Sequence, residues 1–159
     1  MKKIWISISM MVSFAVIIVF SSCGTKSVFN QNQKIENNVW VRDQTIEFEP
    51  EIKDTATKYD VFIDVRHAEY YPYANLVVEL NMIFPSGEER VKEHDLLIRN
   101  PDASFKGEAG GDIWDYSVPV YKNHTFNAIG KYKFSIRNVM PVHETPGLME
   151  IGLTIKKAK

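Results

Sequence analysis

The chain has 159 residues, with 19 Lys and Arg, 20 Asp and Glu, and a formal net charge of −1 at pH 7. This near balance excludes a strongly basic nucleic-acid-binding protein, because binding to phosphates needs a concentrated positive surface. The length suits a single domain with a sizeable core, and one cysteine cannot form an intramolecular disulfide.

The first 22 residues predict a secretory signal peptide. Lys2 and Lys3 precede residues 4–20, which carry no charge and are mostly apolar, and two small serines follow. That stretch is close to the lower length limit of a membrane-spanning helix, but serines interrupt it and no basic cluster comes after it. We therefore expect residues 1–22 to be removed as a signal peptide.

Cys23 comes directly after Ser21 and Ser22, where lipoprotein processing requires a thiol. An ordinary secreted protein with an incidental cysteine is the alternative, but a lone free cysteine in an exported chain is unusual. We expect a bacterial lipoprotein whose mature chain begins at a lipid-modified Cys23 and is held in the membrane by several acyl chains. Removing Lys2 and Lys3 leaves 17 Lys and Arg against 20 Asp and Glu, a net charge of −3.

Residues 24–38 are polar and contain few apolar side chains. This composition predicts that residues 23–38 form a lipid anchor followed by a flexible tether, with a reach of about 20 Å for a coil of this length. We expect the folded domain to occupy residues 39–159.

From residue 39 onward, apolar and polar residues alternate with a period of two, as in half-buried β-strands. The clearest alternation predicts strands over residues 46–48, 59–66, 76–84, 91–98, 113–120, 132–140 and 148–155. About eight short strands separated by Gly, Pro and Asn turns, with no convincing helix, predict a single antiparallel β-sandwich. We prefer a jelly-roll order of the strands.

No motif in the sequence assembles a catalytic or metal site. The four histidines are scattered without metal-ligand spacing, at His67, His94, His124 and His143. Asp60 and Asp64 share a strand face with Arg66, which indicates a solvated, charge-balanced surface rather than a pair of catalytic carboxylates. We expect no enzymatic activity, no metal and no cofactor.

The connection between two strong predicted strands is unusually aromatic. Tyr70, Tyr71 and Tyr73 surround Pro72 there, and Trp114 lies in a later strand. Exposed rings would stack on sugar rings or anchor a protein partner, so these four aromatic residues are candidate contacts with a ligand or partner. Buried rings would instead close the end of the sandwich, with the Tyr hydroxyls bonded to backbone groups, and we favour this structural role.

Several motifs follow one another in a recognisable order after the lone cysteine. They are Tyr71-Pro72-Tyr73-Ala74-Asn75-Leu76, Phe84-Pro85-Ser86-Gly87, the glycine loop at residues 107–112, Gly130-Lys131-Tyr132-Lys133-Phe134 and the last strand at residues 148–155. In this order they resemble the GldH gliding-motility lipoprotein family of the Bacteroidetes. The resemblance covers nearly the whole mature chain, and the Tyr-Pro-Tyr-x-Asn-Leu turn is its most specific part.

The resemblance implies a membrane-anchored, non-enzymatic accessory of the gliding machinery, which moves cells over surfaces. Envelope proteins of the gliding or type IX secretion apparatus are then the expected partners. The alternative is a lipoprotein with a carbohydrate-binding β-sandwich. No catalytic residues come with the family.

Two further expectations follow from what is typical of exported proteins in this phylum. Asp54-Thr55-Ala56 matches a short O-glycosylation pattern in a polar loop, so Thr55 is a candidate modification site. Surface-exported lipoproteins generally carry an acidic run after the lipidated cysteine, whereas residues 24–30 contain no acid and Glu36 is the first one. We therefore expect the domain to face the periplasm.

Overall fold

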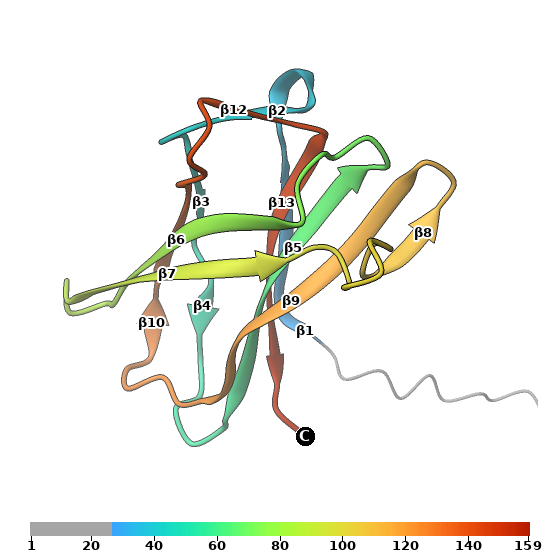
Figure 1. Cartoon of the computed structure of the whole chain (residues 1–159). Helices are drawn as coiled ribbons and strands as arrows, with labels where there is room; N and C mark the ends of the chain where they lie inside the picture. Colours follow the sequence, from blue (N-terminus) through green and yellow to red (C-terminus); the bar gives the residue numbers. More distant parts are fainter. Residues whose placement is uncertain (1–26) are drawn as a thin grey trace, which may run out of the picture.

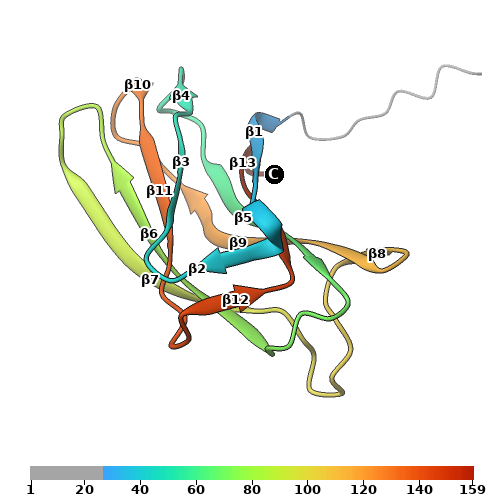
Figure 2. The same ribbon diagram turned by 90° about the horizontal axis from the view of Figure 1, so that it is seen from above.

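Two antiparallel β-sheets pack face to face in the computed structural model, which describes residues 27–159 (Figure 1; Figure 2). One sheet contains, in order, β1 (Ser27–Lys34), β13 (Leu148–Lys157), β5 (Tyr59–Ala68), β9 (Ile113–His124) and β8 (Glu108–Gly110). The other contains, in order, β3 (Thr45–Phe48), β11 (Lys133–Asn138), β6 (Asn75–Ile83) and β7 (Glu89–Leu97). The expected all-β antiparallel sandwich is confirmed.

The strands of four residues or more pair in a nested order. Within the described chain there are eight of them, and the first, β1, pairs with the last, β13. The remaining six form the pairs β3 with β11, β5 with β9, and β6 with β7, and every pair is antiparallel. A nested set of strand pairs folded into two sheets is the jelly-roll arrangement.

Five further strands, of two or three residues each, bring the total in residues 27–159 to thirteen, compared with the eight expected. Apart from β8, they are β2 (Val39–Val41), which pairs with β12 (Glu144–Pro146), and β4 (Glu51–Ile52), which pairs with β10 (Gly130–Lys131). Strands this short hold too few residues to display a period of two. The described chain also has one 3-10 turn, Glu36–Asn38, and none of its helical segments is long and apolar enough to cross a bilayer.

Residues 27–34 form a strand, although the sequence predicted a flexible tether there. Ser27–Lys34 forms β1, the edge strand of the five-stranded sheet, and pairs with β13 along its length. Phe29 alone in this strand is half-buried, and its ring meets Phe48 edge to face at 6.4 Å between centroids. Backbone pairing rather than apolar burial holds β1, which is why the sequence shows no alternation there. Residues 24–26 alone separate Cys23 from the first strand.

The core lies between the two sheets and is filled by the alternating rows that the sequence predicted. Along β6, Leu76, Val78, Leu80 and Met82 are at most 1% exposed, and the intervening residues face outward. The inward row of β13 ends at Ile155, which is fully buried. These rows fix the register, because a shift of one residue would turn every apolar side chain toward solvent.

Asn138 connects the small β2–β12 sheet to the main sandwich. Its side chain is fully buried, and its amide nitrogen donates to the Trp40 carbonyl at 2.8 Å and to the Thr145 hydroxyl at 3.1 Å. Its amide oxygen accepts from the Met140 backbone N–H at 3.0 Å. Three polar groups without access to water therefore depend on one side chain.

Asn138→Ala is expected to lower the free energy of unfolding by about 3 kcal/mol, because it leaves buried donors and acceptors without partners. Asn100→Ala is the control, since it removes one side-chain hydrogen bond, to Ser104, at the surface and should cost about 0.5 kcal/mol. Urea denaturation of both variants measures the difference. Equal losses in the two variants would contradict the role given to Asn138.

Candidate functional site

The aromatic connection after β5 places its tyrosines in different environments. Tyr71 is fully buried, and its hydroxyl donates to the Asn75 carbonyl at 2.8 Å. The ring of Tyr73 meets Tyr71 edge to face, at 77° and 5.7 Å between centroids. Tyr70 is 64% exposed. These rings do not form a coplanar stacking platform, and Tyr70 is the tyrosine of this connection that a partner would reach.

Trp114 belongs to a mixed cluster at the same end of the sandwich. The half-buried Trp114 packs against Phe105 at 5.4 Å, and Phe105 packs against the His67 ring at 4.6 Å. The guanidinium of Arg99 lies 3.6 Å above Phe105 and donates to the Tyr71 carbonyl at 2.8 Å. Arg99 and Phe105 were not predicted as site residues, because they lie outside the regular strands and are paired by an isolated bridge.

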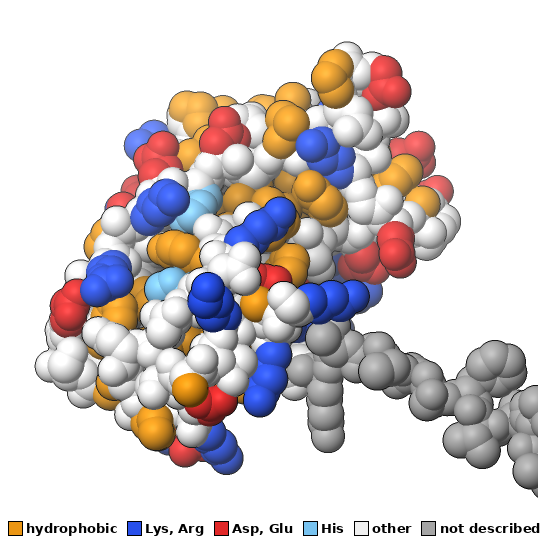
Figure 3. Space-filling view, turned by 90° about the horizontal axis from the view of Figure 1, so that it is seen from below, with side chains coloured by type: hydrophobic (Ala, Val, Ile, Leu, Met, Phe, Trp, Pro, Cys, Tyr) orange, Lys and Arg blue, Asp and Glu red, His pale blue; other side chains and the backbone are white. Residues whose placement is uncertain are grey.

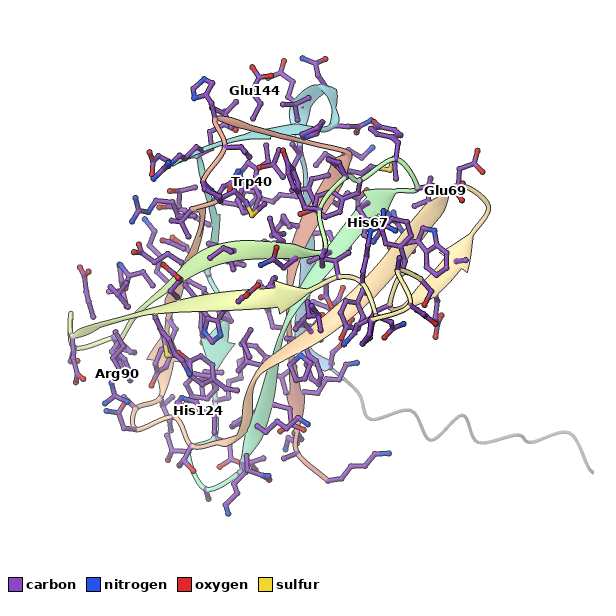
Figure 4. The ribbon with its side chains drawn as sticks, viewed as in Figure 1. Trp40, His67, Glu69, Arg90, His124 and Glu144 are labelled. Carbon is purple, nitrogen blue, oxygen red and sulfur yellow. The ribbon has the colours of Figure 1, made fainter. Side chains whose placement is uncertain are left out.

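The His67 side chain is fully buried in this cluster, at the end of the molecule near Glu69 (Figure 4). Its Nδ1 lies 3.0 Å from the Ala68 carbonyl oxygen, which can only accept, so Nδ1 carries the proton. Its Nε2 has no hydrogen-bond partner among the described residues. Burial lowers the pKa of His67, and the nearby positive charge of Arg99 lowers it further.

Two other histidines lie at the opposite end, where Figure 4 labels His124 near Arg90. His94 and His124 both contact the Tyr121 ring, at 5.8 Å and 5.1 Å between centroids. Burial lowers the pKa of each, and so does a nearby cation, Lys92 for His94 and Arg90 for His124. Neither ring is hydrogen-bonded to a carboxylate in the described chain, so neither has the orienting acid that a catalytic histidine uses.

These lowered pKa values predict that acid destabilises the fold. Below the ordinary histidine pKa of about 6.5, the histidines of the unfolded chain bind protons, whereas the buried histidines of the folded chain do not. The free energy of unfolding therefore falls as the pH falls. His67→Phe should flatten this decline between pH 7 and pH 5, measured as the free energy of unfolding. His143→Phe at an exposed position should leave the decline as it is. An unchanged slope in His67→Phe would contradict this role for burial.

A polar groove of about 190 Å³ crosses the outer face of the five-stranded sheet. Its side chains are the outward-facing residues of β1, β13, β5 and β9, brought side by side by the strand registers. Gly152 leaves room for the Asn32 side chain, which lies where a larger residue in β13 would project. The groove is lined mainly by Asn30, Asn32, Asp64, Arg66, Asp115, Ser117, Glu150 and Thr154.

Hydrogen bonds hold the side chains of this polar groove in place. Arg66 donates through two nitrogens to the Asp115 carboxylate, at 2.7 Å and 3.0 Å, and pairs with Glu150 at 3.3 Å. Asp64 accepts from the Ser117 and Thr154 hydroxyls. The sequence predicted that Asp64 and Arg66 share one charge-balanced face. It did not predict their hydrogen-bond partners on other strands, because the strand registers that bring these residues together cannot be read from it.

The groove is chemically suited to recognition of a polar surface. Its acids are already engaged with an arginine or with hydroxyls, and the hydrogen bond to Asp115 raises the pKa of Arg66, which keeps that guanidinium charged. The described residues contain no cluster of three or more His, Cys, Asp or Glu able to hold a metal ion. Its lining includes no aromatic side chain on the outer face, so it lacks a stacking surface for a sugar ring.

Thr55 and Cys23 are the two predicted modification sites. Thr55 lies in the loop between β4 and β5 and is half-buried, beside Asp54, which accepts from the Ala56 backbone and the Thr57 hydroxyl. Modification of Thr55 stays a prediction. Cys23 lies outside the described residues, and its lipidation also stays a prediction.

Comparison with known proteins identifies the family. The family model described as GldH lipoprotein matches residues 27–155, from the first residue of β1 to the last buried residue of β13. The chain belongs to the GldH lipoprotein family. The match begins at Ser27, so β1, which the sequence analysis placed in a tether, is part of the family's domain.

Two relatives of known name are similar to the chain over most of their length. A gliding motility lipoprotein GldH homolog of Christiangramia forsetii is 30% identical, over 89% of this chain and 91% of its own. The gliding motility lipoprotein GldH of Flavobacterium johnsoniae is 27% identical, over 90% of this chain and 92% of its own length. A structure of infectious bursal disease virus Gx strain aligns with 81% of this chain and 32% of its own, at a TM-score of 0.26 and 9% identity, which is too low to inform on fold or function.

Proposed function

We propose that this chain is a membrane-anchored, non-enzymatic lipoprotein that docks onto the gliding-motility machinery of the cell envelope. The observation that carries the proposal is membership of the GldH family across residues 27–155, together with relatives named as gliding motility lipoproteins. The carboxylates of the polar groove support a non-enzymatic role, because hydroxyls and an arginine already occupy them.

The polar groove is the proposed docking surface. Arg66 is fixed between Asp115 and Glu150, so little side-chain freedom remains to be lost when a partner binds. Asn30 donates to Thr154 at 2.7 Å, and its carbonyl oxygen stays available as an acceptor. A polar protein surface from the gliding or type IX secretion apparatus is the partner that this chemistry suits.

The anchor of the proposed lipoprotein is Cys23. Cys23→Ala removes the only thiol, so the variant should incorporate no fatty-acid analogue in metabolic labelling and should leave the membrane fraction. Cys23→Ser is a matched control of similar size that also lacks the acylated sulfur, and it should behave identically. Undiminished label in either variant would contradict acylation at Cys23.

We also propose that the domain faces the periplasm. The basis is the sequence after Cys23, in which residues 24–30 contain no acid. Protease treatment of intact cells tests the orientation. Survival of the chain supports it, whereas loss of the chain while a periplasmic marker survives would contradict it.

Affinity capture tests the function itself. The lipidated chain and an Arg66→Ala variant are each cross-linked in native envelopes, and the captured proteins are compared. Components of the gliding or secretion apparatus should be recovered with the wild-type chain and reduced with Arg66→Ala. Lys106→Ala changes one charge away from the polar groove and should leave recovery unchanged. Recovery of no such component, combined with normal motility and secretion in cells lacking the chain, would contradict the proposal.

A further inference from the structure

The start and the end of the described chain lie at the same end of the sandwich. Ser27, the first residue of β1, pairs with Lys156 near the end of β13. Ala158 donates its backbone N–H to the Lys58 carbonyl at 2.9 Å, which brings the loop before β5 alongside. Figure 1 shows the loops between β4 and β5 and between β9 and β10 at this end as well. We call it the anchor end, because the chain leads from it to Cys23.

Lysines outnumber acids at the anchor end. Seven lysines belong to it and all but the half-buried Lys156 are exposed: Lys53, Lys58, Lys122, Lys131, Lys156, Lys157 and Lys159. Three carboxylates accompany them, and each is already engaged. Glu51 pairs with Lys53 at 3.3 Å, Asp54 accepts from the Thr57 hydroxyl, and Asp60 accepts from the Asn123 backbone at 2.8 Å.

The view from below shows the Lys and Arg side chains of this surface gathered around the point where the described chain begins (Figure 3). The opposite end is acidic, because five exposed carboxylates, those of Glu36, Glu69, Glu108, Asp112 and Glu144, outnumber its exposed cations, Lys34 and Arg42. Figure 4 labels two of these, Glu69 and Glu144, at that far end. A mature chain of net negative charge therefore directs its positive charge toward its own anchor.

Exposed apolar side chains accompany the lysines. Val28 in β1 is 39% exposed, next to the residue that pairs with Lys156. Ile129 is 65% exposed, and it precedes Gly130, which pairs with Ile52 just before the lysine-bearing loop. Lysines interspersed with exposed aliphatic side chains form the kind of surface that binds a membrane interface.

The covalent distance from Cys23 to the anchor end is short. Three residues separate Cys23 from Ser27, so four Cα-to-Cα steps allow at most about 14 Å of fully extended chain. The headgroup layer of one leaflet takes up roughly 6 Å of that distance. The remaining distance, about 8 Å, is one Debye length at physiological ionic strength. The electrostatic attraction of charged lipid headgroups therefore reaches the lysines of the anchor end.

We infer that the anchor end binds the anionic phospholipid headgroups of the leaflet that holds the lipid anchor. This contact orients the sandwich, so that its acidic end and Tyr70 point away from the membrane. The inference rests on the proposed function in one respect, that a lipid at Cys23 holds this end at a bilayer.

Chemical coupling tests the contact without biological acylation. The mature chain, residues 23–159, is produced in a host that does not modify Thr55, and its single thiol is coupled to a maleimide lipid. The vesicles are phosphatidylcholine alone or phosphatidylcholine mixed with phosphatidylglycerol. Backbone hydrogen exchange is expected to slow in residues 53–58 and 155–159 on the anionic vesicles and to stay unchanged on the neutral ones.

Two triple variants, each lacking three positive charges, show whether binding depends on the lysines of the anchor end or on net charge alone. Lys58→Gln, Lys122→Gln and Lys157→Gln together should abolish the slowing of exchange. They should also lower partitioning of the uncoupled chain onto anionic vesicles about a hundredfold, because each of the three lysines near such a surface contributes roughly fivefold. The control combines Lys34→Gln, Arg42→Gln and Lys106→Gln, and should keep both effects.

Three outcomes would overturn the inference. They are unchanged hydrogen exchange on anionic vesicles, equally slowed exchange on neutral vesicles, and a control variant that loses the slowed exchange and the partitioning to the same extent as the lysine variant. Thiol coupling replaces the biological lipid, so these outcomes say nothing against acylation of Cys23 in cells. Conversely, a failure of fatty-acid labelling would contradict the proposed anchor and leave the coupled-vesicle result standing.

Discussion

The pairing of β1 with β13 determines where the polar groove and the start of the folded domain lie. It is the outermost of the nested strand pairs, joining the first strand to the last. It supplies Asn30 and Asn32 to one side of the polar groove and places Ser27 beside Lys156. Because β1 begins four residues after Cys23, the same pairing sets how far the domain can lie from a membrane anchor.

The sequence was sufficient to predict the strands whose inner faces are buried. β5, β6 and β13 appear as apolar rows, because each has one face against the core. β1 could not be found in this way. Seven of its eight residues are exposed, and its register with β13 is held by backbone hydrogen bonds that every residue type can make. The eight-stranded jelly roll of the structure includes this strand, so the domain expected over residues 39–159 lacked its first strand.

The candidate site was predictable only in part, for a related reason. Asp64 and Arg66 share a face of one strand, which their spacing alone indicates. Their partners come from strands more than forty residues away, with Arg66 reaching Asp115 across 49 positions and Asp64 reaching Thr154 across 90. Those strand registers cannot be read from a single sequence. The buried hydroxyl of Tyr71 is a local contact, four residues from its acceptor, and its structural role was accordingly foreseeable.

Hydrogen exchange of the individual backbone amides in residues 27–34, followed by NMR, shows whether β1 is paired with β13 in solution. An edge strand of an antiparallel sheet directs alternate N–H groups to its partner and the others to solvent. If β1 is part of the sheet, slowly and rapidly exchanging amides should alternate along it, and the slow ones should exchange on the timescale of the β13 amides. Uniformly rapid exchange throughout residues 27–34 would contradict the account, because a flexible tether would then connect Cys23 to a sandwich that lacks its first strand.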